Sequence, residues 1–148
     1  LFSAIVLNFC VNELKYIEKN WMKDNYRGLV DYWYSHECYN KPSIIYYELR
    51  SGFGYYFLKD KRYKKEYENS FIMQPWQRNA SFEDYKKFFE ESFNKGYPES
   101  FYFCIGHNYN KSAVEMVLVF MSLGYEVKEV YYSKDVQILL LNRKYSKE

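Results

Sequence analysis

The chain has 148 residues and a formal net charge of +2, because 21 Lys and Arg nearly balance 19 Asp and Glu. This length predicts one globular domain spanning 1–148, and the charge balance excludes a protein that coats duplex DNA through its overall charge. No run of 18 apolar residues occurs, so we expect no membrane span. The three cysteines, Cys10, Cys38 and Cys104, lie far apart, which predicts free thiols in a cytoplasmic protein.

Aromatic residues are unusually common: the chain has 19 Tyr and 12 Phe, but no Thr and only three Ala. Residues with AT-rich codons are favoured throughout. The codon bias of an AT-rich genome, such as that of a mobile element or its host, accounts for the total. It accounts less well for the clustering of aromatic residues between 44 and 57, which therefore needs another explanation.

The N-terminal part is predicted to contain one strand and two helices. Residues 1–9 are apolar and indicate a buried strand rather than a signal peptide, because no basic segment precedes them. Apolar residues recur at helical spacing over 12–37, with a break expected at Asp24-Asn25 and Gly28. His36, near the end of this segment, is expected to be a partner of the helix dipole and not a metal ligand.

The next segment is predicted to be a hairpin, with strands at 44–50 and 54–58 joined by a turn at 51–54. Residues 63–73 predict a further strand. A basic tract in which cations are interleaved with carboxylates follows the hairpin and continues into this strand (Lys59, Asp60, Lys61, Arg62, Lys64, Lys65, Glu66 and Glu68). Such a tract is typical of a solvated edge strand protected by Lys, and equally of a surface that contacts phosphate.

The predicted turn contains Gly52-Phe53-Gly54-Tyr55, which resembles the centre of the RNP1 motif of RNA-recognition domains. In that family, aromatic side chains on a sheet stack on bases, so the resemblance implies this role for Phe53 and Tyr55. The match covers four residues. The chain departs from the motif at Arg50, which lies one residue too early because Ser51 intervenes.

The second half of the chain predicts helices and strands in alternation. Ser81 begins a helix, with Asp84 as its capping-box partner, and a strand follows at 101–105. Ser112 is expected to cap the next helix with Glu115. That helix is apolar nearly all round, which predicts burial on most sides, and Gly124 ends it. Two strands complete the chain, at 126–132 and 136–142.

This strand–helix–strand–strand ending requires a right-handed crossover that makes the first two strands parallel, after which the last strand returns antiparallel. It resembles the C-terminal end of the sheet of Rossmann-like methyltransferases over 101–142. The glycine-rich cofactor loop of that family has no match in this sequence. The resemblance therefore implies the topology of the unit and no cofactor.

The turn at 106–112 lies between a strand and the start of a helix, where open α/β sheets bind ligands. The free N–H groups of a helix N-terminus favour an anion, so His107, Asn108, Lys111 and Ser112 form an alternative anion site. Such a site would suit a nucleotide- or phosphoester-handling enzyme. An ordinary polar loop explains the same residues, because no phosphate-binding glycine fingerprint is present.

Together these features predict an α/β or α+β fold, a mixed sheet of five or six strands packed by three or four helices. We expect a small non-enzymatic binding protein without cofactor or metal. Its first expected ligand is single-stranded nucleic acid, bound by residues on one exposed face (Phe53, Tyr55, Lys61, Arg62 and Lys64). The alternatives are a protein-interaction or inhibitor module, in which exposed aromatic and Arg side chains are the hot spots, and the enzyme described above.

Overall fold

A computed structural model describes residues 26–74, 79–93, 96–106, 111–133 and 136–144. Residues 26–35 are helical. The helices and strands that follow are, in chain order, β1 (Ser43–Ile45), α2 (Arg50–Lys59), β2 (Phe71–Met73), α3 (Phe82–Ser92), β3 (Ser100–Gly106), α4 (Lys111–Ser122), β4 (Tyr125–Ser133) and β5 (Val136–Arg143). The strand predicted at 1–9 and most of the first predicted helix lie outside the described residues.

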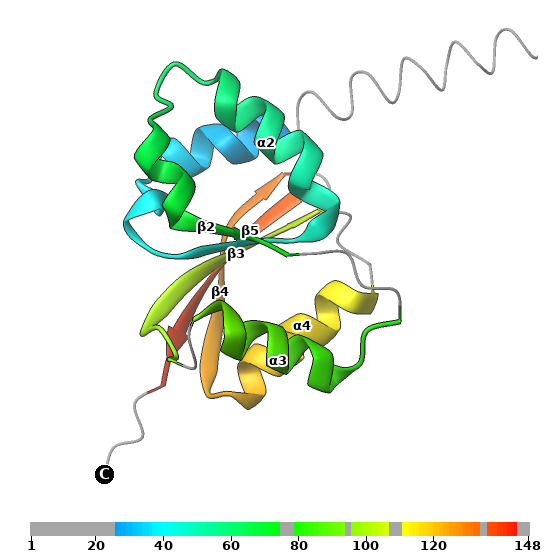
Figure 1. The fold of residues 1–148 in the computed structure, drawn as a ribbon. Coiled ribbons are helices and arrows are strands. Elements are labelled where there is room, and N and C mark those ends of the chain that lie inside the picture. The colour runs from blue at the N-terminus through cyan, green and yellow to red at the C-terminus, as the bar shows by residue number, and fades with distance from the viewer. Residues whose placement is uncertain (1–25, 75–78, 94–95, 107–110, 134–135, 145–148) are drawn as a thin grey trace, which may run out of the picture.

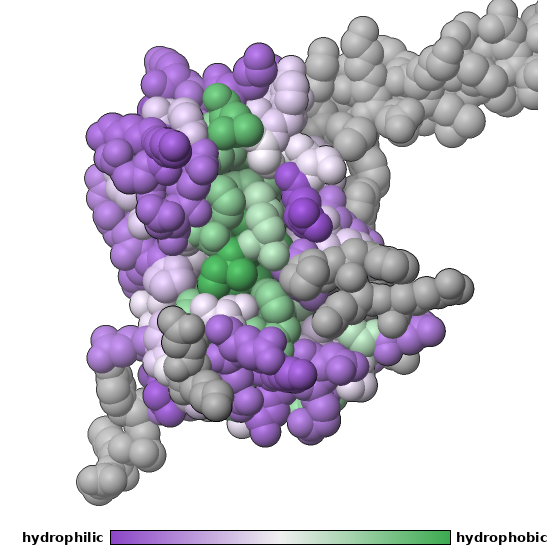
Figure 2. All heavy atoms as spheres, viewed as in Figure 1, coloured by the Kyte–Doolittle hydropathy of each residue, from purple (hydrophilic) through white to green (hydrophobic). Residues whose placement is uncertain are grey.

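The strands form one mixed sheet in the order β2-β1-β3-β5-β4. β1 pairs in parallel with both β2 and β3, and β5 runs antiparallel to both β3 and β4. Helix 26–35 and α2 cover one face of this sheet, and α3 and α4 cover the other (Figure 1). The expected mixed sheet packed by helices is confirmed. Between the two helical layers, Figure 2 shows a band of hydrophobic surface over the position of β2.

Each face of the sheet has its own buried cluster. Under α3 and α4, Phe89 packs against Phe101 and Phe120, with ring centroids 5.2 and 5.0 Å apart. Under helix 26–35 and α2, Trp33 is fully buried, and its indole N–H donates to Ser43 Oγ at 3.1 Å. Because the indole N–H has an acceptor, burial of this large ring leaves no donor without a hydrogen bond.

The predicted hairpin is wrong beyond Ile45. Of the strand expected at 44–50 only the part in β1 is extended, since Tyr47–Leu49 form a 3-10 helix, and α2 replaces the expected turn and second strand. Phe53 and Phe57 lie four residues apart and both contact Trp33, at centroid distances of 6.1 and 5.5 Å, so they share one face of a helix. Gly52 permits this packing, because an added Cβ would lie 2.6 Å from ring carbons of Tyr26. A glycine that predicted a turn thus marks the close approach of two helices.

Two other predicted features also differ. Of the strand expected at 63–73, only β2 is extended, and Lys65–Ser70 form a 3-10 helix. Helix 26–35 continues through Gly28, so the helix does not break there, and the other two residues of the expected break, Asp24 and Asn25, lie outside the described residues. Tyr131 explains why a glycine occupies position 28, since the Tyr131 hydroxyl would lie 2.5 Å from a Cβ added there.

The C-terminal half follows the predictions closely. Ser81 and Asp84 form the expected capping box of α3. The predicted strand–helix–strand–strand unit is present as β3, α4, β4 and β5, with β5 antiparallel between the other two strands. Gly124 follows α4 with a φ of +88°, the left-handed region that glycine tolerates best.

Two expectations for α4 are corrected. Ser112 lies inside the helix rather than at its cap, since α4 already includes Lys111. The helix is not buried on most sides, because Val114, Leu118 and Met121 are exposed by 51, 51 and 53%. An outer-layer helix buries only the face that meets the sheet and its neighbour. None of the helices in the described part of the chain has the length and apolar character that crossing a membrane requires.

Candidate functional site

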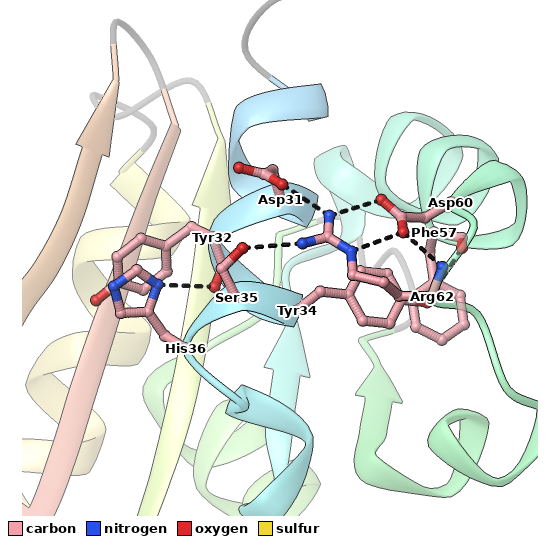
Figure 3. Close-up of polar contacts among 8 residues, drawn as sticks. All are labelled: Asp31, Tyr32, Tyr34, Ser35, His36, Phe57, Asp60 and Arg62. Atoms are coloured by element: carbon pink, nitrogen blue, oxygen red, sulfur yellow. Dashed lines mark hydrogen bonds and ion pairs between the residues drawn. The ribbon is translucent and has the colours of Figure 1, made fainter.

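A network of ion pairs around Arg62 joins helix 26–35 to the segment that follows α2 (Figure 3). Arg62 Nε and Nη2 donate to the two carboxylate oxygens of Asp60, both at 2.8 Å. Nη2 also donates to Asp31 Oδ1 at 2.7 Å, and Nη1 donates to Ser35 Oγ at 2.9 Å. The planar guanidinium therefore binds one carboxylate in bidentate fashion and reaches across to a second helix.

The charges of this network stabilise one another. The hydrogen bond from Arg62 holds the pKa of Asp60 below its ordinary value, and the bond to Asp60 in turn raises the pKa of Arg62. The guanidinium also lies over the ring of Tyr34, 5.1 Å from its centroid. Burial raises the pKa of Tyr34, whose hydroxyl donates to Phe57 O at 3.2 Å. Arg62 is thus a fixed crosslink rather than a free cation.

Beside this network lies a groove with a volume of about 730 Å³, between helix 26–35 and α2. Sites for small ligands usually measure about 300–1,000 Å³, so the groove is large enough to hold one. Its lining combines aromatic, cationic and acidic side chains with two small or aliphatic ones (Arg27, Gly28, Val30, Asp31, Tyr55, Tyr56, Lys59, Asp60 and Lys61).

The aromatic side of the groove consists of two adjacent tyrosines of α2: Tyr55 is exposed, and Tyr56 is half-buried against the cluster that contains Trp33. Tyr55 is 60% exposed, and its ring meets that of Tyr56 edge-on at a centroid distance of 5.1 Å. Arg27, from the facing helix, lies 5.7 Å from the centroid of Tyr56. Lys59 follows Tyr55 by one helical turn, so both residues lie on the same side of α2. An accessible ring and cations therefore share one concave surface.

The structure separates the five residues predicted to bind a ligand. Tyr55 and Lys61 line the groove, and Arg62 lies behind it in the ion-pair network. Phe53 is fully buried, so the prediction that it lies on an exposed face is wrong. Lys64 does not line the groove, and its Nζ lies 5.6 Å from the ring centroid of Tyr67.

Among the aromatic and cationic residues that line the groove, three were absent from the predicted site: Arg27, Tyr56 and Lys59. Tyr56 and Lys59 belong to the aromatic segment and the basic tract, so their position in the sequence was a usable signal. Arg27 gave no such signal, because it reaches the groove only through the packing of helix 26–35 on α2.

The segment predicted as an alternative anion site follows β3 in the chain, and the carboxyl end of β3 lies beside that of β1. These adjacent parallel strands lead to helices on opposite faces, which is where open α/β sheets have a crevice. Gly106 lies at this edge, where an added Cβ would be 2.6 Å from a methyl carbon of Leu49. His107 and Asn108 lie outside the described residues, and Lys111 and Ser112 are the first two residues of α4.

The remaining candidate metal ligands do not gather. His36 follows helix 26–35, stacks on Tyr32 with ring centroids 3.8 Å apart, and its Nδ1 lies 3.1 Å from Tyr32 O. Cys38 and Cys104 are buried free thiols, and burial raises the pKa of both. Within the described ranges, no group of three His, Cys, Asp or Glu side chains is placed to hold a metal ion.

No protein-family model, curated protein or solved structure matches this chain. Function is therefore inferred from the geometry of the groove.

Proposed function

We propose that the protein binds single-stranded nucleic acid in the groove between helix 26–35 and α2. The observation that supports this most is the combination of exposed Tyr55 and half-buried Tyr56 with three cations along one concave surface. Proteins that bind single strands use this combination, because bases stack on aromatic rings while cations neutralise the phosphates. Tyr55 presents the more exposed ring and is the stacking platform.

The charge of the groove favours an anionic ligand. Both lining carboxylates, Asp31 and Asp60, are paired with Arg62. None of the three lining cations, Arg27, Lys59 and Lys61, forms an ion pair with a described residue. These cations are thus available to phosphates at little cost in existing contacts.

A single strand fits this surface better than a duplex. Bases in a duplex are stacked on one another and do not present a face to Tyr55, whereas unpaired bases do. The net charge of +2 is also too small for binding to duplex phosphates to depend on overall charge. The positive charge that matters is local, at one end of α2.

Fluorescence anisotropy with a short labelled oligothymidine tests the proposal. Three phosphate contacts predict that log K falls against log salt concentration with a slope of about −2, since each contact to a single strand contributes about −0.7. The absence of measurable, salt-dependent binding at low salt would contradict the proposal.

Substitutions locate the binding surface. Tyr55→Ala is expected to weaken binding by about 5- to 150-fold, the loss of one stacked base at about 1–3 kcal/mol. Tyr132→Ala is the matched control, because Tyr132 is 56% exposed on β4, away from the groove. Lys61→Ala is expected to make the salt slope shallower by about 0.7. Equal losses in the two tyrosine variants would exclude the groove as the binding surface.

A further inference from the structure

β2 forms one edge of the sheet that the described residues build, and its strand neighbour is β1. The N–H of Gln74, directly after β2, donates to Ile45 O of β1 at 3.0 Å. Because alternate residues of a strand turn their backbone groups to the same side, Ile72 also faces β1. The N–H and C=O groups of Phe71 and Met73 therefore point away from the sheet.

The side chains of β2 divide between the two faces of the sheet. Phe71 and Met73 pack against the buried cluster beneath helix 26–35 and α2. Ile72 points to the opposite face and belongs to neither of the two buried clusters. The hydrophobic band in Figure 2 crosses the position that β2 has in Figure 1. An apolar side chain and four outward backbone groups are thus present at the same edge.

The opposite edge of the sheet, β4, is protected against pairing. Glu126, Lys128 and Glu129 are exposed on it, and its register shifts between Glu129 and Tyr131. Charges and bulges of this kind prevent another strand from adding to an edge. β2 is short but contains no charged residue, and its register with β1 is regular.

We propose that a second copy of the chain pairs with β2 in antiparallel fashion, across a two-fold axis at Ile72. Phe71 then lies opposite the partner's Met73, and Met73 opposite the partner's Phe71. Each of these pairs exchanges two N–H···O=C bonds, so that every outward backbone group of β2 gains a partner. This self-complementarity is why a second copy, rather than an unrelated peptide, is the occupant.

The same axis places Ile72 directly opposite the partner's Ile72 in a non-hydrogen-bonded pair, where Cα atoms are about 4.5 Å apart. Two β-branched side chains in contact across such a pair stabilise it. Because the strand has only three residues, the dimer is expected to be weak and to form at high protein concentration. No residue lining the groove belongs to β2, so this inference is independent of the proposed function.

Disulfide trapping tests this register. Ile72→Cys is expected to form a covalent dimer under mild oxidation, since a Cα separation of about 4.5 Å is within disulfide range. Val114→Cys is the matched control, because Val114 is exposed by 51% on α4. Pairing at β2 should make trapping at position 72 faster by about tenfold or more, through its effective concentration. Equal rates at the two positions would overturn the proposal, and wild type gives the background from native cysteines.

Sedimentation velocity tests self-association without a crosslink. The weight-average mass of the wild type is expected to rise above the 18.2 kDa monomer as concentration increases. Ile72→Lys should abolish that rise, because like charges would face each other across the axis, whereas Val114→Lys should not. Thermal unfolding shows whether each variant is folded. A wild type that stays monomeric throughout, or folded Lys variants that behave alike, would overturn the proposal.

Discussion

Trp33 and Phe89 lie at the centres of two aromatic clusters on opposite faces of the sheet. Around Phe89, rings pack on rings, and the outer face of the layer is aliphatic, with Leu118 and Met121 exposed. Around Trp33 the aromatic residues continue outward. Tyr34 lies beneath Arg62, and Tyr55 reaches solvent beside cations.

The aromatic residues on the two faces of the sheet therefore differ in their surroundings. On the Phe89 side, aromatic residues fill a core. On the Trp33 side, rings also line a groove next to Arg and Lys side chains, which core filling does not require. The position of an aromatic residue relative to charge is therefore more informative about function than the total.

The largest expected effect is the loss of either central ring. Trp33→Ala and Phe89→Ala should each lower the free energy of unfolding by about 3–5 kcal/mol, because a large buried side chain is deleted. Trp33→Ala should cost more, since it also leaves buried Ser43 without its donor, a further loss of about 1–3 kcal/mol. Chemical denaturation measures both values. A smaller loss for Trp33→Ala would contradict its central place in the cluster.

Arg62→Ala is expected to have the next largest effect on the free energy of unfolding. It tests the ion-pair network of the Trp33 layer. Losing hydrogen bonds to Asp60 and Asp31 should cost about 1–3 kcal/mol, because the group is partly solvated. Oligonucleotide binding should also weaken, since both carboxylates would face the groove without their counter-charge.

Two further variants control this result. Lys87→Ala breaks the exposed pair with Glu91 in α3 and should cost only about 0–1 kcal/mol. Arg62→Lys should not restore the wild-type stability, because an ammonium group does not reproduce the bidentate contact. If Arg62→Ala costs no more than Lys87→Ala, the network does not hold the two helices together.

The two glycines of α2, Gly52 and Gly54, are expected to respond to alanine with changes in stability of opposite sign. Gly52→Ala should destabilise by about 1–3 kcal/mol, because its Cβ would overlap the Tyr26 ring. Gly54→Ala should stabilise by about 0.4–1 kcal/mol, because nothing lies within 4 Å of the added Cβ and alanine favours a helix. Thermal or chemical unfolding measures both. Destabilisation by Gly54→Ala would favour the hairpin turn over the helix.

The smallest expected effect is on the pH dependence of stability. Hydrogen bonds from Arg62 to Asp60, and from Ser81 to Asp84, hold the pKa of each carboxyl below its ordinary value. Their contribution is present above the unfolded-state pKa of about 3.9 and is lost as pH falls through the lower folded value. Asp60→Asn should flatten this acid-side loss in denaturation measured from neutral pH to about pH 2. An unchanged slope would show that Asp60 is not linked to folding.

Local signals were sufficient to predict the C-terminal half of the fold. The Ser81 capping box and the glycine after α4 define helix ends through contacts within a few residues. The segment 50–59 was mispredicted because its helical state depends on contacts distant in sequence. Phe53 and Phe57 meet Trp33, and Gly52, a residue type typical of turns, permits close packing there instead.

The groove was predicted only in part for the same reason. Tyr55 and Lys61 belong to a segment rich in aromatic and basic residues, so composition pointed to them. Arg27 lies far from that segment and joins it through helix packing alone. Sequence also does not distinguish Lys61, which forms no ion pair with a described residue, from Arg62, which forms ion pairs with two carboxylates.

Photocrosslinking tests the central claim most directly, because it reports which ring contacts a base. A single-stranded oligonucleotide containing 5-iodouracil is bound, irradiated and digested, and the modified residues are identified by mass spectrometry. Stacking in the groove predicts adducts on Tyr55 or Tyr56, the two tyrosines that line it. Adducts on Tyr132 of β4, with none in the groove, would contradict the account.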